Sequence, residues 1–191
     1  MKSMIKSAAL ASAFLVAPVA AQAQAVPAAI VVVVDTQKIF ADCTACKAAQ
    51  TQLQSQATAI QQRAQALGQP LQAEAEAIQK AAGGKAPDAA LQTRIRALQT
   101  KEGSANQEIQ GRQQTFARNR AYVAEQINVK LNPIISQVMQ KRGANIAVDQ
   151  GATLAAASAL DVTADVLAQL NAQLPSVSVN APAAPANPAG R

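Results

Sequence analysis

Residues 53–78 read LQSQATAIQQRAQALGQPLQAEAEAI and determine the architecture expected of this chain. Apolar residues recur there at alternating steps of four and three, with one step missed at Glu74: Leu53, Ala57, Ile60, Ala64, Leu67, Leu71 and Ile78. This heptad spacing is typical of a coiled coil, in which a narrow apolar seam packs against a second helix. Gln and Ala fill most other positions and favour a long helix.

A second heptad pattern follows a strong break. Residues 83–87, GGKAP, should end the first helix, and Asp88 can cap the next one. The seam resumes at Leu91, Ile95, Leu98, Ala105, Ile109, Phe116 and Val123, then slips in register through Ile127, Leu131, Ile134 and Val138 before Gly143. Two long helices with so short a connection must fold back antiparallel. We therefore predict a helical hairpin over residues 36–143 with its tip at 83–87.

The two ends of the chain supply strands. Residues 30–34, IVVVV, are a β-branched run typical of a buried strand, and Thr36 is placed to cap the following helix. Residues 145–148 form a second candidate strand and residues 153–157 a weaker third. A short helix follows, which starts in residues 161–167 and ends before Pro175. So small a sheet would leave open edges and needs partners.

The predicted fold class is therefore α+β. Residues 28–35 and 144–174 form a small β association body of about three strands per chain, and a long antiparallel coiled-coil hairpin projects from it. Apolar sheet edges predict an oligomer with the sheets at its centre.

The terminal segments have separate roles. Residues 1–25 have the layout of a signal peptide: Lys2 and Lys6, an apolar run over 8–20, and small residues that allow cleavage after Ala23 or Ala25. We expect an exported protein, periplasmic in a Gram-negative source. Residues 175–191 are rich in Pro and Ala and predict a disordered tail.

The chain contains no His and only two Cys. It therefore lacks a Ser-His-Asp triad, a Cys-His pair and a His-based metal centre, and we predict no enzyme activity, cofactor or metal. Cys43 and Cys46 have the spacing of redox motifs, but the surrounding alternation of strands and helices is missing. An exported compartment favours a local disulfide between them. Free or inter-subunit thiols and redox catalysis are the alternatives.

Charge is unevenly distributed. Residues 38–142 carry 14 basic and 7 acidic side chains, a net of +7, whereas the rest of the mature chain has a net of −3. An exported protein is a poor partner for nucleic acid, so acidic polypeptides or anionic lipid head groups fit better. Six cations along the second arm are the candidate client- or lipid-binding residues: Arg94, Arg96, Lys101, Arg112, Arg118 and Arg120. The alternative is a solvated coiled-coil face. Phe116 lies on the seam and is expected in the core.

Both arms carry helix-breaking residues at one height. Gly68 and Pro70 interrupt the first arm and Gly103 the second. All three lie roughly 25 Å from the tip by helix rise. We predict a hinge there that lets the distal hairpin swing, with a fixed kink at Pro70 as the alternative.

The order of these segments resembles the Skp/OmpH family of periplasmic chaperones. The resemblance covers residues 30–174 and is carried by Val34-Asp35, by IAVD at 146–149, by DVTADVL at 161–167 and by QQTFA at 113–117. It implies a jellyfish-shaped homotrimer with a barrel-like body and three hairpin tentacles. It also implies that the protein holds unfolded outer-membrane proteins without ATP. The excess of basic residues makes anionic lipid or lipopolysaccharide surfaces further candidate partners.

The predicted function is therefore that of a holdase chaperone. One alternative is a structural adaptor whose hairpin packs on a partner's helices. Another is a thiol-disulfide protein that uses Cys43 and Cys46, and double replacement by Ser would abolish its activity.

Overall fold

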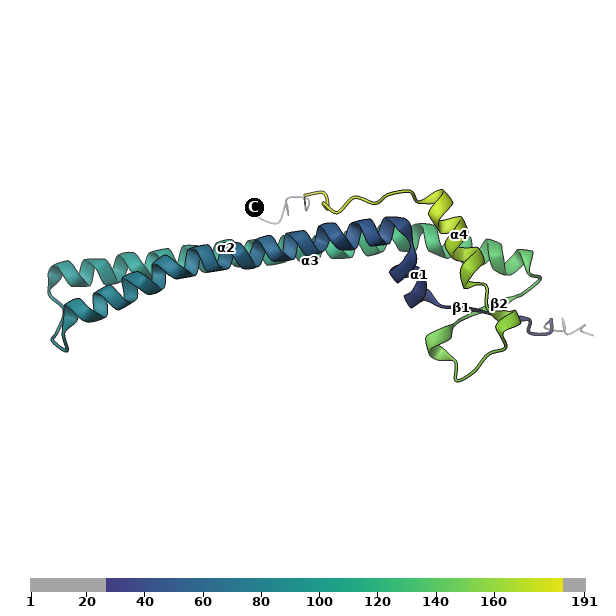
Figure 1. Ribbon diagram of the computed structural model, residues 1–191, viewed down its shortest axis with the longest axis horizontal. Helices are drawn as coiled ribbons and strands as arrows, with labels where there is room; N and C mark the ends of the chain where they lie inside the picture. Colours follow the sequence, from purple (N-terminus) through teal and green to yellow (C-terminus); the bar gives the residue numbers. More distant parts are fainter. Residues whose placement is uncertain (1–26, 184–191) are drawn as a thin grey trace, which may run out of the picture.

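A computed structural model describes residues 27–183, in which a long helical hairpin projects from a small body (Figure 1). The elements follow the order β1, α1, α2, α3, β2, η1, η2 and α4. The predicted signal peptide, 1–25, and the last residues, 184–191, lie outside the described part. The α+β fold class with a coiled-coil hairpin is confirmed.

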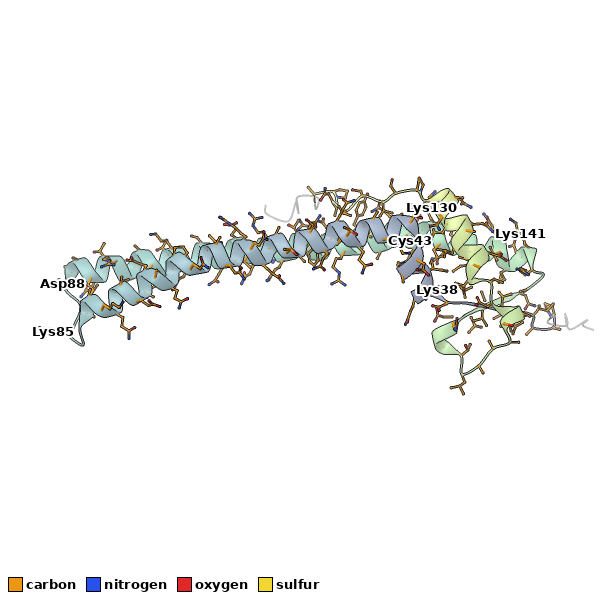
Figure 2. All side chains as sticks on the ribbon, in the orientation of Figure 1. Lys38, Cys43, Lys85, Asp88, Lys130 and Lys141 are labelled. Atoms are coloured by element: carbon orange, nitrogen blue, oxygen red, sulfur yellow. A yellow bond between two sulfur atoms is a disulfide. The ribbon has the colours of Figure 1, made fainter. Side chains whose placement is uncertain are left out.

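The hairpin consists of α2, Thr44–Ala82, and α3, Ala89–Lys141. Gly83 and Gly84 have φ values of 54° and 76°, a left-handed conformation that glycine adopts without steric cost, and so they end α2 and turn the chain. Asp88 then caps α3, since its carboxylate accepts a hydrogen bond from the Leu91 amide at 2.8 Å. The helices are about 60 and 80 Å long by helix rise, and Figure 2 places Lys85 at their far end.

A separate short helix precedes the hairpin. Helix α1, Thr36–Asp42, ends at Cys43, whose extended backbone also begins α2, so the hairpin starts at Thr44 and not at residue 36. Asp35, and not Thr36 as expected, caps α1 by accepting from the Lys38 amide at 2.7 Å. The Thr36 hydroxyl instead donates to the Asp149 carboxylate at 2.5 Å, which joins α1 to the second strand.

The sheet is smaller than predicted. Strand β1, Val31–Val34, pairs in parallel with β2, Ile146–Asp149, and the whole hairpin is the crossover between them. The predicted third strand at 153–157 is wrong, because this segment is a loop between the 3-10 turns η1, Gln150–Ala152, and η2, Ser158–Leu160. It is mostly Ala and has no apolar alternation to bury. A single parallel bridge joins Asp161 to Val33 instead.

One apolar core unites the body with the base of the hairpin. Helix α4, Thr163–Gln173, packs against the C-terminal part of α3 and against α1. Its Val166 and Leu170 are fully buried with Ile39 of α1 and Ile134 of α3. Both strands, which are far apart in the sequence, are thereby fixed to the foot of the projecting arm.

The predicted disordered tail is wrong for residues 175–183. After α4 this segment runs back along the base of the hairpin, drawn in yellow in Figure 1. Val179 is buried in the body core, and Val177 packs against it. Composition suggested disorder, but alternating valines and side-chain amides on the hairpin order this part of the chain.

Candidate functional site

Within residues 27–183, no group of three or more His, Cys, Asp and Glu side chains is placed to bind a metal ion. None of the helices in this range is both long and apolar enough to cross a membrane. Three kinds of surface in the described residues can bind another molecule: the hairpin, the grooves at its base and the edge of the sheet.

Buried apolar residues form two clusters in the hairpin, one near its tip and one at its base. The stretch between them, residues 50–77 and 99–118, has no buried side chain, and we name it the bare middle. Near the tip, Ile78, Leu91 and Leu98 are buried together. The body core reaches outward only to Ala49 in α2 and to Val123 among the apolar residues of α3. The seam residues in the bare middle, which only two helices share, are half-buried.

Ion pairs replace the core in the bare middle. Arg63 donates two hydrogen bonds to Glu108 across the arms, at 2.8 and 2.9 Å, and Arg112 donates to the same carboxylate at 2.9 Å. These hydrogen bonds, the one from the Arg63 side chain first, lower the pKa of Glu108 to about 2. Farther out, Arg94 contacts Glu74 at 3.0 Å. Exposed pairs of this kind add little stability, but they fix which residues of the two arms lie opposite.

The three hinge candidates lie in this bare middle. Helix α2 stays continuous through Pro70, which has no amide hydrogen to donate to the Ala66 carbonyl. A Cβ atom built on Gly68 or Gly103 would meet no atom within 4 Å, so packing does not require glycine at either position. Pro70 also lines an open cavity of about 480 Å³ between the arms. Swinging at this height stays a prediction.

The six candidate cations are spread along α3 and around it, and they do not form a single patch. Residues 94–120 span about 40 Å of α3 by helix rise. Arg94 and Arg112 are in ion pairs, and Arg120 lies over the Phe116 ring at 6.0 Å from its centroid. Arg118 donates to the Thr115 hydroxyl at 3.2 Å. Within the described residues, Arg96 and Lys101 form no ion pair. Their role in client or lipid binding stays a prediction.

An open groove of about 580 Å³ lies where α1 meets the base of both arms. Its apolar wall includes Phe40, Leu53, Phe116 and Ile127, and Arg120 stands at its edge. Phe116 is half-buried in this wall and does not belong to the body core, contrary to expectation. The sequence analysis did not identify Phe40 as a functional residue. The signal that could have done so is its rarity, since the chain has only three Phe and one Tyr. We name this surface the phenylalanine groove.

A different surface of the hairpin base holds the chain's own C-terminal segment. Gln126 binds both backbone groups of Ser178: its Nε2 donates to the carbonyl at 2.9 Å and its Oε1 accepts from the amide at 3.0 Å. The Oδ1 atom of Asn119 accepts from the Ala181 amide at 2.9 Å. We name this surface, with Gln56, the tail groove. Asn119 occupies a skipped apolar step of the second seam, a signal that sequence analysis passed over.

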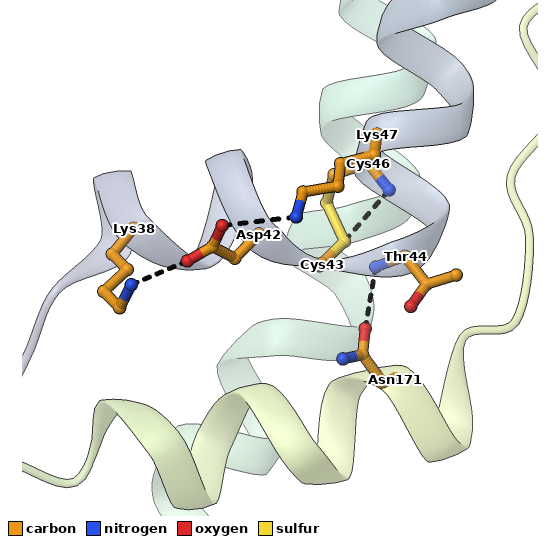
Figure 3. Close-up of polar contacts among 7 residues, drawn as sticks. All are labelled: Lys38, Asp42, Cys43, Thr44, Cys46, Lys47 and Asn171. Carbon is orange, nitrogen blue, oxygen red and sulfur yellow. Dashed lines mark hydrogen bonds and ion pairs between the residues drawn. A yellow bond between two sulfur atoms is a disulfide. The ribbon is translucent and has the colours of Figure 1, made fainter.

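The joint between body and arm contains the two cysteines (Figure 3). Cys43 and Cys46 form a disulfide, and both are buried, with 0% and 5% of their surface exposed. The Cys46 amide donates to the Cys43 sulfur at 3.0 Å. The Thr44 amide donates to Asn171 of α4 at 2.8 Å, which ties the first turn of α2 to the body.

Two lysines flank a carboxylate at the same joint. Asp42 contacts Lys38 at 2.7 Å and Lys47 at 3.3 Å, so it links α1 to α2 (Figure 3). Hydrogen bonds from the Lys38 side chain, then from that of Lys47, lower the pKa of Asp42. The disulfide and the Asp42–Lys47 ion pair both lie at the corner between α1 and α2.

The body presents an open sheet edge. In the described chain β1 pairs with β2 and with Asp161, whereas the outer side of β2 has no strand partner. Exposed apolar side chains gather on the strand starts and on the loop after β2: Ile30, Ile146, Leu154 and Leu160. An edge of this kind is suited to pairing with another chain.

The model of the outer membrane protein (OmpH-like) family matches residues 30–170. The chain belongs to the OmpH-like family. Its fold matches a crystal structure of an OmpH-like protein of Caulobacter crescentus CB15, described as a candidate outer membrane chaperone, with a TM-score of 0.67 and 21% identity over 81% of this chain and 90% of that one. A comparison with curated proteins found no match.

The OmpH-like match includes β1, both arms, β2 and most of α4. It ends before the segment 175–183, so the contacts in the tail groove lie beyond the residues that match the family.

Proposed function

We propose that this protein is an ATP-independent periplasmic holdase that binds unfolded outer-membrane proteins and prevents their aggregation. Membership of the OmpH-like family and the shared fold support a chaperone rather than an enzyme. The observation that carries the proposal is the hairpin itself. It extends far beyond the body, and its apolar residues between the tip and base clusters are only half-buried.

The mechanism is physical. The phenylalanine groove offers apolar contact area, and the cations of α3 attract acidic segments over a distance comparable to the Debye length, about 10 Å in moderate salt. Each contact is weak, but several acting on one flexible chain give useful avidity. Release needs no nucleotide, because the client leaves when the membrane offers a better apolar environment.

We also propose that the body joins copies into a homotrimer. The unpaired outer edge of β2 and the exposed Ile30 and Ile146 support association through the sheets. The three hairpins would then surround a shared space that admits an unfolded chain. Export by residues 1–25, and contact of the α3 cations with anionic lipid or lipopolysaccharide, belong to the same proposal.

The test is an aggregation assay. A urea-unfolded β-barrel membrane protein is diluted into buffer without nucleotide, and light scattering is followed with and without the chaperone while salt is titrated. We expect suppressed scattering that weakens as salt rises. Phe116→Ser should reduce suppression, whereas Val129→Ser, at a side chain that is 64% exposed and lies outside the groove, should not. Unchanged scattering with the wild-type protein would refute the holdase.

The thiol-disulfide alternative has less support from the geometry. A thiolate must reach a sulfur in line to exchange a disulfide, and Cys43 and Cys46 are both buried. Replacing both with Ser should therefore leave aggregation suppression intact. An adaptor would bind a defined partner but would not suppress scattering, so the same assay separates it.

A further inference from the structure

The C-terminal segment 175–183 is bound as an extended peptide, and the bonds that hold it go largely to its backbone. Gln126 satisfies both main-chain groups of Ser178, and Asn119 accepts from the Ala181 amide. Gln56 Nε2 lies 3.5 Å from the Val179 carbonyl and 3.4 Å from Asn180 Oδ1. Main-chain groups are common to every sequence, so these contacts can serve other chains.

The side chains of the segment alternate between buried and exposed. Val177 and Val179 pack against the body core, whereas Ser178 and Asn180 are exposed. Residues two apart share a face in an extended chain, so the groove selects for small apolar residues at alternate positions. This apolar-polar alternation is the sequence signature of the strands of membrane β-barrels.

The tail groove contains a hydrogen-bond acceptor that whatever occupies it must satisfy. Asn119 is buried, with 5% of its surface exposed, and its Nδ2 donates to Gln56 at 3.0 Å while its Oδ1 accepts from the tail. A ligand that covers this oxygen without donating a hydrogen bond would leave a buried acceptor unsatisfied, which is costly. An incoming backbone amide would restore the bond. The site therefore fits an extended polypeptide better than a lipid tail or a detergent.

We propose that the tail groove is a binding site for extended client segments with alternating small apolar residues, the pattern of an unfolded barrel strand, and that residues 175–183 are a built-in competitor for it. This inference rests on the proposed holdase function and names one of its contact surfaces. Tail and client strand exclude each other, so release of the tail exposes the site at the foot of the arm, where a captured chain can enter from the hairpin.

The test uses the full chain with its tail released. Val179→Asp places a charge in the buried position, and Ser178→Pro removes the amide that donates to Gln126 at an exposed position that should not disturb folding. Ser176→Asp, exposed in the same segment, is the control for added charge. The probes are a labelled synthetic peptide of residues 175–183 and a urea-unfolded β-barrel protein. Circular dichroism confirms that helix content is unchanged.

A tail that is bound nine-tenths of the time weakens a competing segment about tenfold. We therefore expect both release variants to bind the peptide and the unfolded barrel protein about tenfold more tightly than the wild type and Ser176→Asp do. In the released background, Gln126→Ala should remove most of that gain.

Two results would overturn the proposal. In the first, the peptide fails to bind the released variants. In the second, the peptide binds but affinity for the barrel protein does not change, which would make the tail a structural strap. Loss of aggregation suppression in the wild type as well as the variants, with peptide binding intact, would instead count against the holdase function.

Discussion

Pro70→Ala should stiffen the hairpin at the height where both arms carry helix-breaking residues. A proline in a helix interior costs about 3 kcal/mol relative to alanine, because it removes a hydrogen bond and crowds the preceding turn. This difference already includes the freer unfolded chain of the alanine variant. A stabilisation of about 3 kcal/mol lowers the population of locally opened hairpin about 150-fold.

The assay is native-state hydrogen exchange, read at amides of residues 60–75, together with spin-label distances from the tip to the body. Slower exchange and a narrower distance distribution are expected in Pro70→Ala. The matched control is Pro133→Ala in α3, which is also an exposed helix-interior proline. Pro133 itself is exposed, but its neighbours Leu131 and Ile134 belong to the body core. Its replacement should therefore raise global stability without changing tip motion.

The reasoning would be refuted by unchanged exchange at residues 60–75 in Pro70→Ala. It would also fail if Pro133→Ala narrowed the tip distances equally, since the effect would then be one of overall stability and not of a local weak point. Gly68→Ala and Gly103→Ala, which meet no steric obstacle, should each act in the same direction by about 1 kcal/mol.

Three further outcomes follow. Ile134→Ala should lower the free energy of unfolding by about 2–5 kcal/mol, as the side chain is fully buried, whereas the exposed Val129→Ala should change it by less than about 0.5 kcal/mol in urea melts. The pKa of Glu108 falls to about 2 on folding, so its contribution is present above pH 4.5 and is lost as pH falls toward 2. Urea midpoints should therefore drop more on acidification in the wild type than in Glu108→Gln, and parallel curves would contradict this. Replacing Cys43 and Cys46 with Ser should lower stability by about 2 kcal/mol while aggregation suppression persists, and loss of suppression in a folded variant would count against a purely structural disulfide.

Periodicity was the strongest source of correct prediction. The heptads before and after residues 83–87 specify two long helices, and the two glycines between them allow the reversal, so the hairpin followed from local sequence. The two strands were also predicted, because IVVVV is short and β-branched and is followed by Asp35, but their parallel pairing was not.

Several features depended on residues distant in the chain. Helical sequence runs from residue 36 into α2, yet the helix breaks at Cys43, where the next amide is bound by Asn171 of α4. The tail was predicted to be disordered from its composition, but Gln126 and Asn119 bind its backbone. Phe116 follows the heptad but lines an open groove together with Phe40 of α1.

By itself, the sequence determined the elements: which stretches are helical, where the chain reverses and which residues form a seam. These properties depend on spacing and backbone preference, and neighbours within about seven residues settle them. Only the tertiary structure decided where α1 separates from α2, which stretch of the seam has no buried side chain and what the C-terminal segment contacts. Those outcomes depend on side chains that meet across more than 50 residues, and the free energy of such contacts is defined only once both partners are in place.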